Sequence, residues 1–231
     1  MYCGYNQFVE GKYQHSGTAY SDLLDTGWTT FTPIEHDVPH IIWLWKIRQY
    51  DHILYGVGYL EGEKPVLLQS SDGKTWTTVT KFQLDGVLSE ADICFSEDSV
   101  FVCLRQDTPV GSPSYWGISK YPFKVFDWRI MDVSVASPEM IIHPQTNQIL
   151  LSGREYNFHN DDKPDSIKVS LFSVDVNGKT ERLHVFDTSK GDDKGYPSFL
   201  YIDGILYLSY YYGNSLTRVS IAGIGMVRKN E

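Results

Sequence analysis

The hydrophobic pattern along the chain consists of short apolar and aromatic runs separated by polar turn residues. The runs are rich in β-branched or aromatic side chains and are bounded by Gly, Asp, Asn or Ser. This pattern is typical of β-strands, and no stretch has the apolar spacing of an amphipathic helix. It predicts strands near residues 43–47, 53–59, 66–70, 76–79, 91–95, 100–104, 115–118, 199–202, 205–209 and 217–220. We therefore expect an all-β protein.

Four runs end in a serine that is followed by a turn. Ser21, Ser70, Ser119 and Ser173 are 49, 49 and 54 positions apart. A period of this size indicates repeated small sheets, and four strands per period are typical of a β-propeller blade. In the sharpest copy, residues 70–76, we expect an aspartate to bind turn amides, a glycine to take a positive φ and a tryptophan to pack beneath. The repeats predict a β-propeller of four-stranded antiparallel blades.

Length and composition fit a single domain. The 231 residues are 42% hydrophobic and 14% aromatic, enough for a large core, and no Pro- or Gly-rich linker interrupts them. No apolar run reaches the roughly 18 residues that cross a bilayer. We expect one soluble domain over residues 1–231, with no membrane partner.

Charge and metal-ligand spacing argue against other function classes. The formal net charge is −9 and no cluster of Lys and Arg is present, so we expect no nucleic-acid partner. Three cysteines and seven histidines show no metal-ligand spacing, so we expect neither metal nor organic cofactor. The aspartate pairs at 161–162 and 192–193 are better interpreted as solvated turns than as calcium loops. The first residues lack a secretion signal, which favours a cytoplasmic location unless a leader was removed.

Three charged residues occupy comparable strand edges in adjacent repeats. Glu90 immediately precedes the predicted innermost strand of its blade, Arg105 closes the next strand, and Arg154 closes the corresponding strand one blade later. Innermost strands of a propeller line a central channel, so equivalent positions converge at its mouth. Two arginines there would bind a small acidic ligand through paired hydrogen bonds. The alternative is that each arginine pairs with a local carboxylate such as Asp107 or Glu155.

The order of several motifs resembles the sialidase (neuraminidase) family. Residues 89–95 and then 102–105 are similar to the family's pattern of a glutamate that starts one strand and an arginine that ends the next. Residues 195–211 resemble its nucleophile segment, a tyrosine before a strand-turn-strand hairpin. The serine-centred turns resemble its Asp-box, or BNR, repeats. The resemblance covers nearly the whole chain and implies descent from a six-bladed architecture.

The resemblance implies a role for each candidate residue. Tyr196 would be the nucleophile and Glu90 the base that activates it, while Arg105 and Arg154 would bind the carboxylate of a sialic acid. A neutral phenol suits this chemistry because it does not repel the carboxylate at the anomeric centre. In the alternative interpretation, Tyr196, one of the 16 tyrosines of the chain, only packs at the start of a strand, and Glu90 is a solvated turn residue.

The chain departs from the family pattern at its beginning. The family's first blade carries one arginine of the triad and the aspartate that protonates the leaving group, and we find no counterpart for it. Lys46, on a predicted innermost strand, is a candidate substitute cation, although a lysine there can simply extend to solvent. Asp22, Asp25 and His15 are the nearest candidates for the acid, but they lie in or beside a turn.

The missing blade shapes the expected architecture and function. We expect five blades, with the N-terminal strand as a candidate to complete the last one. The alternative is an open arc whose unpaired edges would favour a homo-oligomer. The primary functional expectation is a sialidase-like glycoside hydrolase that acts on a terminal acidic sugar. The alternatives are a non-catalytic glycan-binding propeller without the general acid and first arginine, and a protein-binding scaffold.

Overall fold

The computed structural model describes residues 2–9, 12–20, 30, 32–107, 109, 111–157, 166–187, 193–213 and 218–224. Within these ranges the chain consists of strands, turns and irregular connections. The turn at Ser21 and the acid candidates Asp22 and Asp25 lie outside the described residues. The side chain of His15 and those of the aspartate pairs at 161–162 and 192–193 also lie outside them.

The described strands form five sheets in chain order. The first contains β1 (Tyr2–Val9), β2 (Lys12–Tyr20) and β3 (Thr32–Pro33). The second contains β5 (Trp43–Tyr50), β6 (Ile53–Tyr59), β7 (Val66–Ser70) and β8 (Thr75–Lys81), with the short β4 (Glu35–His36) parallel to β8. The third contains β9 (Leu88–Ser96), β10 (Ser99–Gln106), β11 (Tyr115–Lys120) and β12 (Asp127–Ile130). The fourth contains β13 (Ala136–Ile142), β14 (Ile149–Asn157), β15 (Ser166–Val174) and β16 (Thr180–Asp187), and the last β17 (Asp193–Ile202), β18 (Ile205–Gly213) and β19 (Arg218–Ile224).

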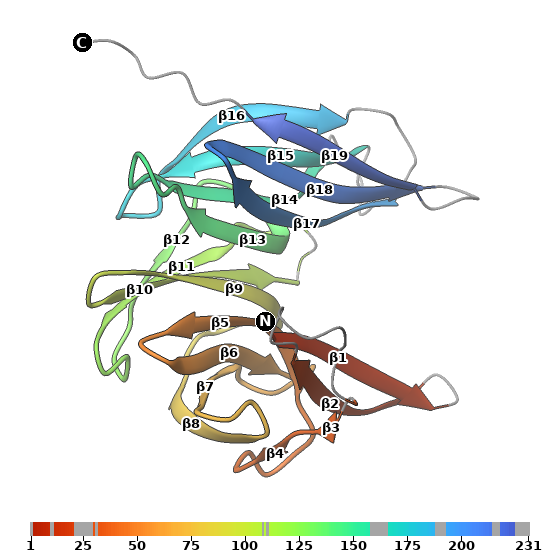
Figure 1. Cartoon of the computed structure of the whole chain (residues 1–231), viewed down its shortest axis with the longest axis vertical. Helices are drawn as coiled ribbons and strands as arrows, with labels where there is room; N and C mark the ends of the chain where they lie inside the picture. The colour runs from red at the N-terminus through yellow and green to blue at the C-terminus, as the bar shows by residue number, and fades with distance from the viewer. Residues whose placement is uncertain are drawn as a thin grey trace.

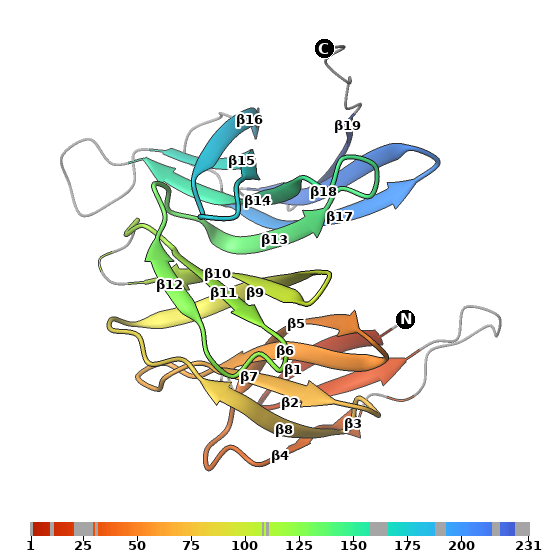
Figure 2. The ribbon, with the colours of Figure 1, turned by 90° about the vertical axis from the view of Figure 1, so that its left-hand side faces the viewer.

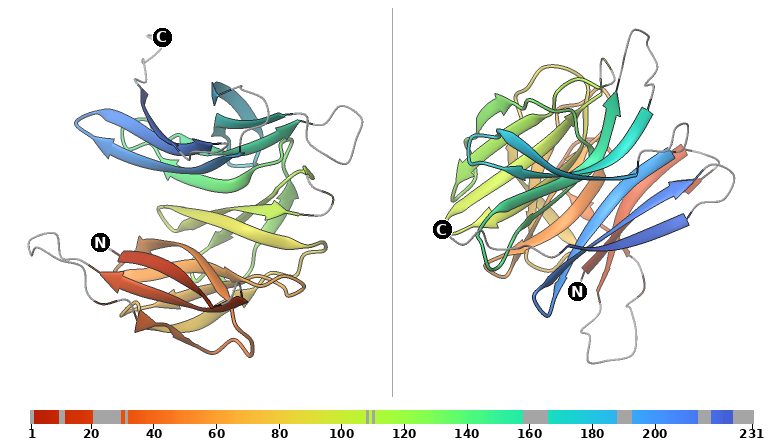
Figure 3. Two further views of the ribbon diagram at one scale, coloured as in Figure 1. Left: turned by 90° about the vertical axis from the view of Figure 1, so that its right-hand side faces the viewer. Right: turned by 90° about the horizontal axis from the view of Figure 1, so that it is seen from above.

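These sheets are the blades of a propeller, so the predicted all-β fold with antiparallel blades is confirmed. Figure 1 shows them following one another from β1–β3, in red, to β17–β19, in blue, and Figures 2 and 3 show the same succession from other sides. The innermost strands β1, β5, β9, β13 and β17 pack against one another in that order. Among the described residues, no comparable packing joins β17 back to β1.

The first and last blades have three strands each within the described residues. The N-terminal strand does not complete the last blade: β1 pairs with β2 and packs against β5. A hairpin between neighbouring segments closes a short loop, whereas pairing with β19 would bring together opposite ends of the chain at a higher entropic cost. The expectation for this strand was therefore wrong.

The repeated serines mark the third strand of successive blades. Ser70 ends β7, Ser119 lies next to the end of β11, and Ser173 lies next to the end of β15. Each therefore stands where the chain turns toward the outermost strand of its blade. The period in the sequence is the period of the blades.

The turn after Ser70 has the hydrogen bonds that its sequence predicts. Asp72 Oδ1 accepts hydrogen bonds from Lys74 N at 2.8 Å and from Thr75 N at 2.9 Å. Gly73 has a φ of 74°, and its carbonyl accepts a 3.1 Å bond from the indole of Trp76, which is fully buried. Such side-chain bonds replace the missing ladder bonds of the turn. This hairpin is therefore specified by a few adjacent residues.

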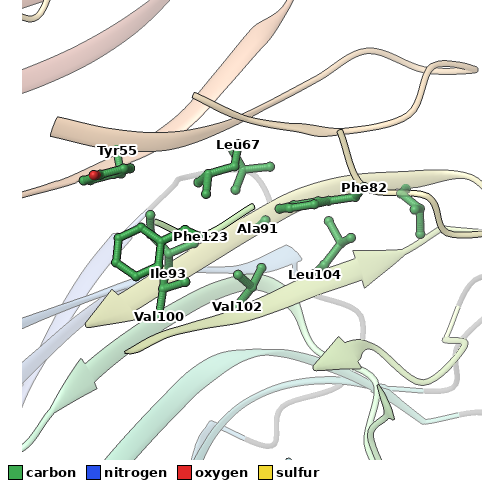
Figure 4. Close-up of a cluster of buried hydrophobic side chains, with 11 residues drawn as sticks. Tyr55, Leu67, Phe82, Ala91, Ile93, Val100, Val102, Leu104 and Phe123 are labelled. Carbon is green, nitrogen blue, oxygen red and sulfur yellow. The ribbon is translucent and has the colours of Figure 1, made fainter. Parts of the chain in front are cut away.

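An apolar cluster holds the second blade against the third (Figure 4). Tyr55 and Leu67 come from the second blade, Ile93 and Val102 come from the third, and Phe123 joins them from the loop after β11. All five side chains are buried. Burying one such side chain contributes about 1.5–3 kcal/mol. This packing fixes β5 beside β9, the two strands that carry Lys46 and Glu90.

Every innermost strand has a β-bulge or irregularity in its pairing. In β5 the extra residue is Lys46, in β9 Ser89 and Glu90 oppose the single Arg105, and β13 and β17 are interrupted around Ser137 and Tyr196. The pairing of β1 shifts as well. Lys46, Ser137 and Tyr196 have φ values of 41°, 50° and 47°, which non-glycine residues rarely adopt. Bulges redirect side chains, and here they mark the mouth, the region where the innermost strands meet.

Candidate functional site

Glu90 is the centre of a group of side chains that we call the mouth cluster: Glu90, Arg105, Asp107 and Tyr196. Glu90 is 5% exposed. Its Oε2 accepts hydrogen bonds from Arg105 Nη1 and from the backbone N–H of Ser137, both at 2.7 Å. Its Oε1 accepts a 3.0 Å bond from the hydroxyl of Tyr196. One carboxylate oxygen is thus held in place, while the other faces an exchangeable proton.

Tyr196 combines an exposed position with a closely packed ring. It is 44% exposed, yet its ring lies 5.4 Å from that of Trp45 and stacks on Tyr211 at 5.6 Å. Burial of the hydroxyl, together with the neighbouring Glu90, raises the pKa of Tyr196 to about 12. The phenol is therefore neutral at physiological pH. It can act as a nucleophile only if a base takes its proton, and Glu90 is the carboxylate in position to do so.

Arg105 connects Glu90 to a second carboxylate. Its Nη1 binds Glu90, and its Nε lies 2.6 Å from Asp107 Oδ1. Burial lowers the pKa of Arg105, but Glu90 and Asp107 outweigh this effect and raise it overall. The sequence left two interpretations open, convergence at the mouth and a local pair with Asp107. The structure shows both contacts for Arg105, because its guanidinium pairs with Asp107 and also holds Glu90 in position.

Arg154 lies on the other side of Tyr196. Its Cζ is 5.6 Å from the centre of the Tyr196 ring, a cation–π arrangement. The guanidinium donates hydrogen bonds to the carbonyl of Lys194 and to the hydroxyls of Tyr156, at 3.2 Å, and Tyr211, at 3.0 Å. Its predicted local partner, Glu155, instead binds Arg182 and Ser170. The pair of Arg154 with Glu155 is therefore not formed.

Gly195 gives Arg154 its place against the backbone of β17. A Cβ at this position would lie 2.9 Å from Arg154 Nη2, closer than Cβ atoms approach other heavy atoms in folded proteins. Gly195 also has a φ of 154°. The glycine before Tyr196 therefore allows the guanidinium to lie directly beside the phenol.

Lys46 belongs to a second ionic group, which we call the inner cluster: Lys46, Arg48, Asp92 and Glu139. Arg48 Nε donates to Asp92 Oδ1, and its Nη2 lies near Glu139 Oε2, both at 3.0 Å. Lys46 pairs with Glu139 and donates to the carbonyl of Pro197 at 3.3 Å. Lys46 is thus not extended into solvent, and its partners are Glu139 and Pro197 rather than a side chain of the mouth cluster. It joins β5, β13 and the segment after Tyr196.

Three carboxylates of the two clusters also accept hydrogen bonds from backbone N–H groups of the next blade. Glu90 binds Ser137 N, Asp92 binds Met140 N at 2.6 Å, and Glu139 binds Phe199 N at 3.0 Å. These bonds satisfy backbone amides of innermost strands, each of which is an edge strand with a ladder partner on one side only. The innermost strands are therefore joined by carboxylates as well as by apolar packing.

Sequence reasoning missed Arg48, Asp92 and Glu139. Asp92 stands two positions after Glu90, and alternate residues of a strand share one face. That spacing was the available signal for a second carboxylate in the channel. The partners of Asp92 come from β5 and β13, so they depend on how the blades pack.

Two further features bear on the function classes. Within the described part of the chain, no three His, Cys, Asp or Glu side chains are grouped as a metal site. None of the described segments forms a helix with the length and apolarity needed to span a membrane.

The sequence matches no known protein family and no curated protein. The structure, in contrast, is similar to solved glycoside hydrolases. A thermostable family-43 glycoside hydrolase aligns with a TM-score of 0.59 and 10% identity, over 84% of this chain and 72% of that one. A xylan β-1,4-xylosidase from Bacillus halodurans aligns with a TM-score of 0.56 and 13% identity, over 80% and 40%. A family-32 β-fructofuranosidase from Bombyx mori aligns with a TM-score of 0.60 and 12% identity, over 98% and 57%.

Hydrolases of families 43 and 32 have a five-bladed β-propeller fold, which agrees with the five blades here. At these identities the likeness concerns the fold alone. The chain spans less than two thirds of the last two proteins. The fold is therefore a propeller like that of these hydrolases, and the neighbours do not support assignment to the sialidase family.

Proposed function

We propose that the chain is a glycoside hydrolase that acts on a terminal acidic sugar, with Tyr196 as the nucleophile and Glu90 as its base. The observation that carries this proposal is the 3.0 Å hydrogen bond from the Tyr196 hydroxyl to Glu90 Oε1. The two residues are 106 positions apart and come from different blades. A neutral phenol and a carboxylate held by Arg105 have the geometry of a nucleophile and its base.

The proposed reaction has two steps. Tyr196 Oη forms a bond to the anomeric carbon, the bond to the leaving group breaks, and the phenol proton passes to Glu90 Oε1. Water then forms a bond to the anomeric carbon, the bond to Tyr196 breaks, and Glu90 returns the proton to the departing phenolate while the proton of the water is released to solvent. Two displacements retain the configuration of the sugar.

The two arginines have different roles in this proposal. Arg105 positions Glu90, because its guanidinium is bound by Glu90 and Asp107. Arg154 lies beside the nucleophile and is the cation for a sugar carboxylate, which would replace some of its present hydrogen bonds to tyrosine hydroxyls. Among the described residues, the mouth holds fewer cations for the sugar than the sialidase resemblance implies. We therefore expect weaker selection for acidic sugars than a complete arginine triad would give.

No general acid is identified among the described residues of the mouth. The leaving group therefore decides which substrates the chain can hydrolyse. An aryl leaving group departs without a proton, whereas an alkyl alcohol needs one. We expect the purified chain to hydrolyse a methylumbelliferyl α-sialoside much faster than an alkyl sialoside. The Tyr196→Phe variant should lose at least about 100-fold in kcat/KM because it lacks the attacking oxygen.

Tyr201→Phe is the matched control, because it removes one phenol hydroxyl from the same strand. Tyr201 packs in an apolar cluster with Leu150 and Leu206, away from the mouth cluster. This variant should keep the activity of the parent chain. Activity that survives in Tyr196→Phe would contradict the assignment of the nucleophile.

A second candidate is a glycan-binding propeller without catalysis. It is favoured by one observation: Glu90, Arg105 and Arg154 are all bound within the protein. If the folded chain binds the aryl sialoside without hydrolysing it, this second function replaces the first.

A further inference from the structure

A pocket of about 560 Å³ lies beside the mouth cluster. Its wall includes Trp43, Tyr59, Glu61, Ser89, Arg105 and Asp107. Arg105 and Asp107 belong to both the pocket wall and the mouth cluster, and the Arg105 guanidinium binds Glu90 as well as Asp107. The volume lies within the range of pockets that bind small molecules, roughly 300–1,000 Å³. The proposed reaction at Tyr196 does not use this space.

Aromatic rings form a continuous track from the pocket to Tyr196. Trp43 and Tyr59 stack at 6.0 Å with an angle of 10° between their planes. Trp45 lies 6.5 Å from Tyr59 and 5.4 Å from Tyr196. Large, rigid rings with polar edges bind the apolar face of a flat, hydroxylated ligand. A continuous aromatic surface therefore connects the pocket to the Tyr196–Glu90 pair.

The polar groups of the pocket favour an uncharged ligand. They include one guanidinium, from Arg105, and two carboxylates, from Glu61 and Asp107, so an anion meets more like charge than opposite charge. A carboxylate and a guanidinium side by side offer an acceptor and donors for hydroxyl groups. Ser89 Oγ, a buried atom of a wall residue, has no hydrogen-bond partner among the described residues. Aromatic walls with a few polar groups are suited to a neutral sugar ring.

We propose that this pocket binds a second, uncharged sugar unit of the substrate, next to the terminal sugar at Tyr196. This inference rests on the proposed function in one respect, the identity of the mouth as a sugar site. The natural substrate is then an oligosaccharide, which the chain hydrolyses more slowly than an aryl sialoside because its alcohol leaving group needs a proton. The second unit packs on Trp43 and Tyr59 and hydrogen-bonds to Asp107 and Arg105.

The test measures sugar binding separately from hydrolysis. The full chain is titrated with lactose, maltose and xylobiose, and binding is followed by tryptophan fluorescence and by saturation-transfer NMR. We expect a saturable response to at least one of these neutral sugars. Trp43→Ala should weaken it about tenfold or more, and Trp43→Phe should restore part of it because a phenyl ring keeps an aromatic wall.

Two variants complete the design. Tyr121→Ala removes a 66% exposed aromatic side chain outside the pocket and should leave the response unchanged. Asp107→Asn keeps the shape of the side chain while removing its charge, and should weaken the response even if Trp43→Ala does not fold. A response that persists unchanged in Trp43→Ala or in Asp107→Asn overturns the proposal. Absence of a saturable response to all three sugars overturns it as well.

The Tyr196→Phe variant separates this inference from the proposed function. Neutral sugar binding should be retained in that variant, since its substitution lies outside the pocket wall. If the chain binds a neutral sugar but hydrolyses no substrate, the pocket is supported as a sugar site and the proposed hydrolysis at Tyr196 is contradicted. If the chain hydrolyses the aryl sialoside but binds none of the neutral sugars, the proposed hydrolysis is supported and the pocket is not a sugar site.

Discussion

The mouth cluster and the inner cluster use the same kinds of side chain but differ in how their carboxylates are bound. In the inner cluster, Asp92 is fully buried and both of its oxygens accept bonds from Arg48 and from backbone N–H groups. In the mouth cluster, Glu90 Oε1 accepts a bond from a tyrosine hydroxyl, while Oε2 is held by Arg105 and Ser137. A carboxylate saturated by cations and amides stabilises the fold. A carboxylate with one oxygen on a hydroxyl can accept a proton.

The largest effect should come from removing a carboxylate of the inner cluster. Asp92→Ala leaves Arg48 without its main partner and leaves two backbone N–H groups unpaired. We expect the free energy of unfolding to fall by about 3 kcal/mol. Urea denaturation measures it, with Asp98→Ala as the control, since Asp98 pairs with Lys120 on the surface. If the two variants were equally stable, the inner cluster would not be a structural element.

Glu90→Gln should have the opposite profile, a large loss of activity with a smaller loss of stability. The amide keeps the shape of the side chain and can still accept hydrogen bonds, but it is a poor base for Tyr196. We expect kcat to fall about 100-fold and the free energy of unfolding to fall by about 1–2 kcal/mol. Hydrolysis of the aryl sialoside and urea denaturation of the same sample measure both. A variant that is as active as the parent chain would remove Glu90 from the reaction.

The hairpin at residues 70–76 lies outside both clusters and should show a smaller, purely local effect. Asp72→Ala removes the acceptor of two turn amides, and the expected cost is about 1 kcal/mol of unfolding free energy. These turn amides lower the pKa of Asp72, so this contribution is present at neutral pH and is lost as the pH falls through the lowered pKa. Denaturation at neutral and strongly acidic pH should show the difference between variant and parent disappear in acid.

The smallest effect is a shift in the titration of one tyrosine. The pKa of Tyr196 is raised to about 12 by burial and by Glu90. The neutral phenol therefore stabilises the fold fully at pH values below 10, the usual pKa of tyrosine. This stabilisation is lost as the pH rises from 10 to 12. Ultraviolet difference spectra of the parent chain against Tyr196→Phe isolate this titration. Glu90→Gln should move the pKa back toward 10. An unchanged titration would show that the two side chains do not interact in solution.

Local features of the fold could be predicted from the sequence. Strand β6 was predicted with the bounds that the structure has, and the turn of Ser70 and Asp72 has its expected hydrogen bonds. Such features depend on neighbouring residues. The pairing of β1 was not predicted, because an edge strand can satisfy its hydrogen bonds in more than one sheet.

The candidate site was predictable only in part. Glu90 and Arg105 were selected from their positions at strand edges, and Tyr196 through a family resemblance. The structure brings all three into one hydrogen-bonded group. Their catalytic roles remain predictions. The inner cluster was missed because Asp92 and Arg48 meet only after two blades pack together, and no local pattern specifies that contact.

The most direct test of the reacting pair is to trap the covalent intermediate. A difluorinated sialic acid has a fluoride leaving group that needs no acid, and its second fluorine slows hydrolysis of the sugar from the protein. After incubation and proteolysis, mass spectrometry should find the sugar on the peptide that contains Tyr196, and the Tyr196→Phe variant should carry none. A folded chain without an adduct, or with the sugar on another residue, would contradict the account.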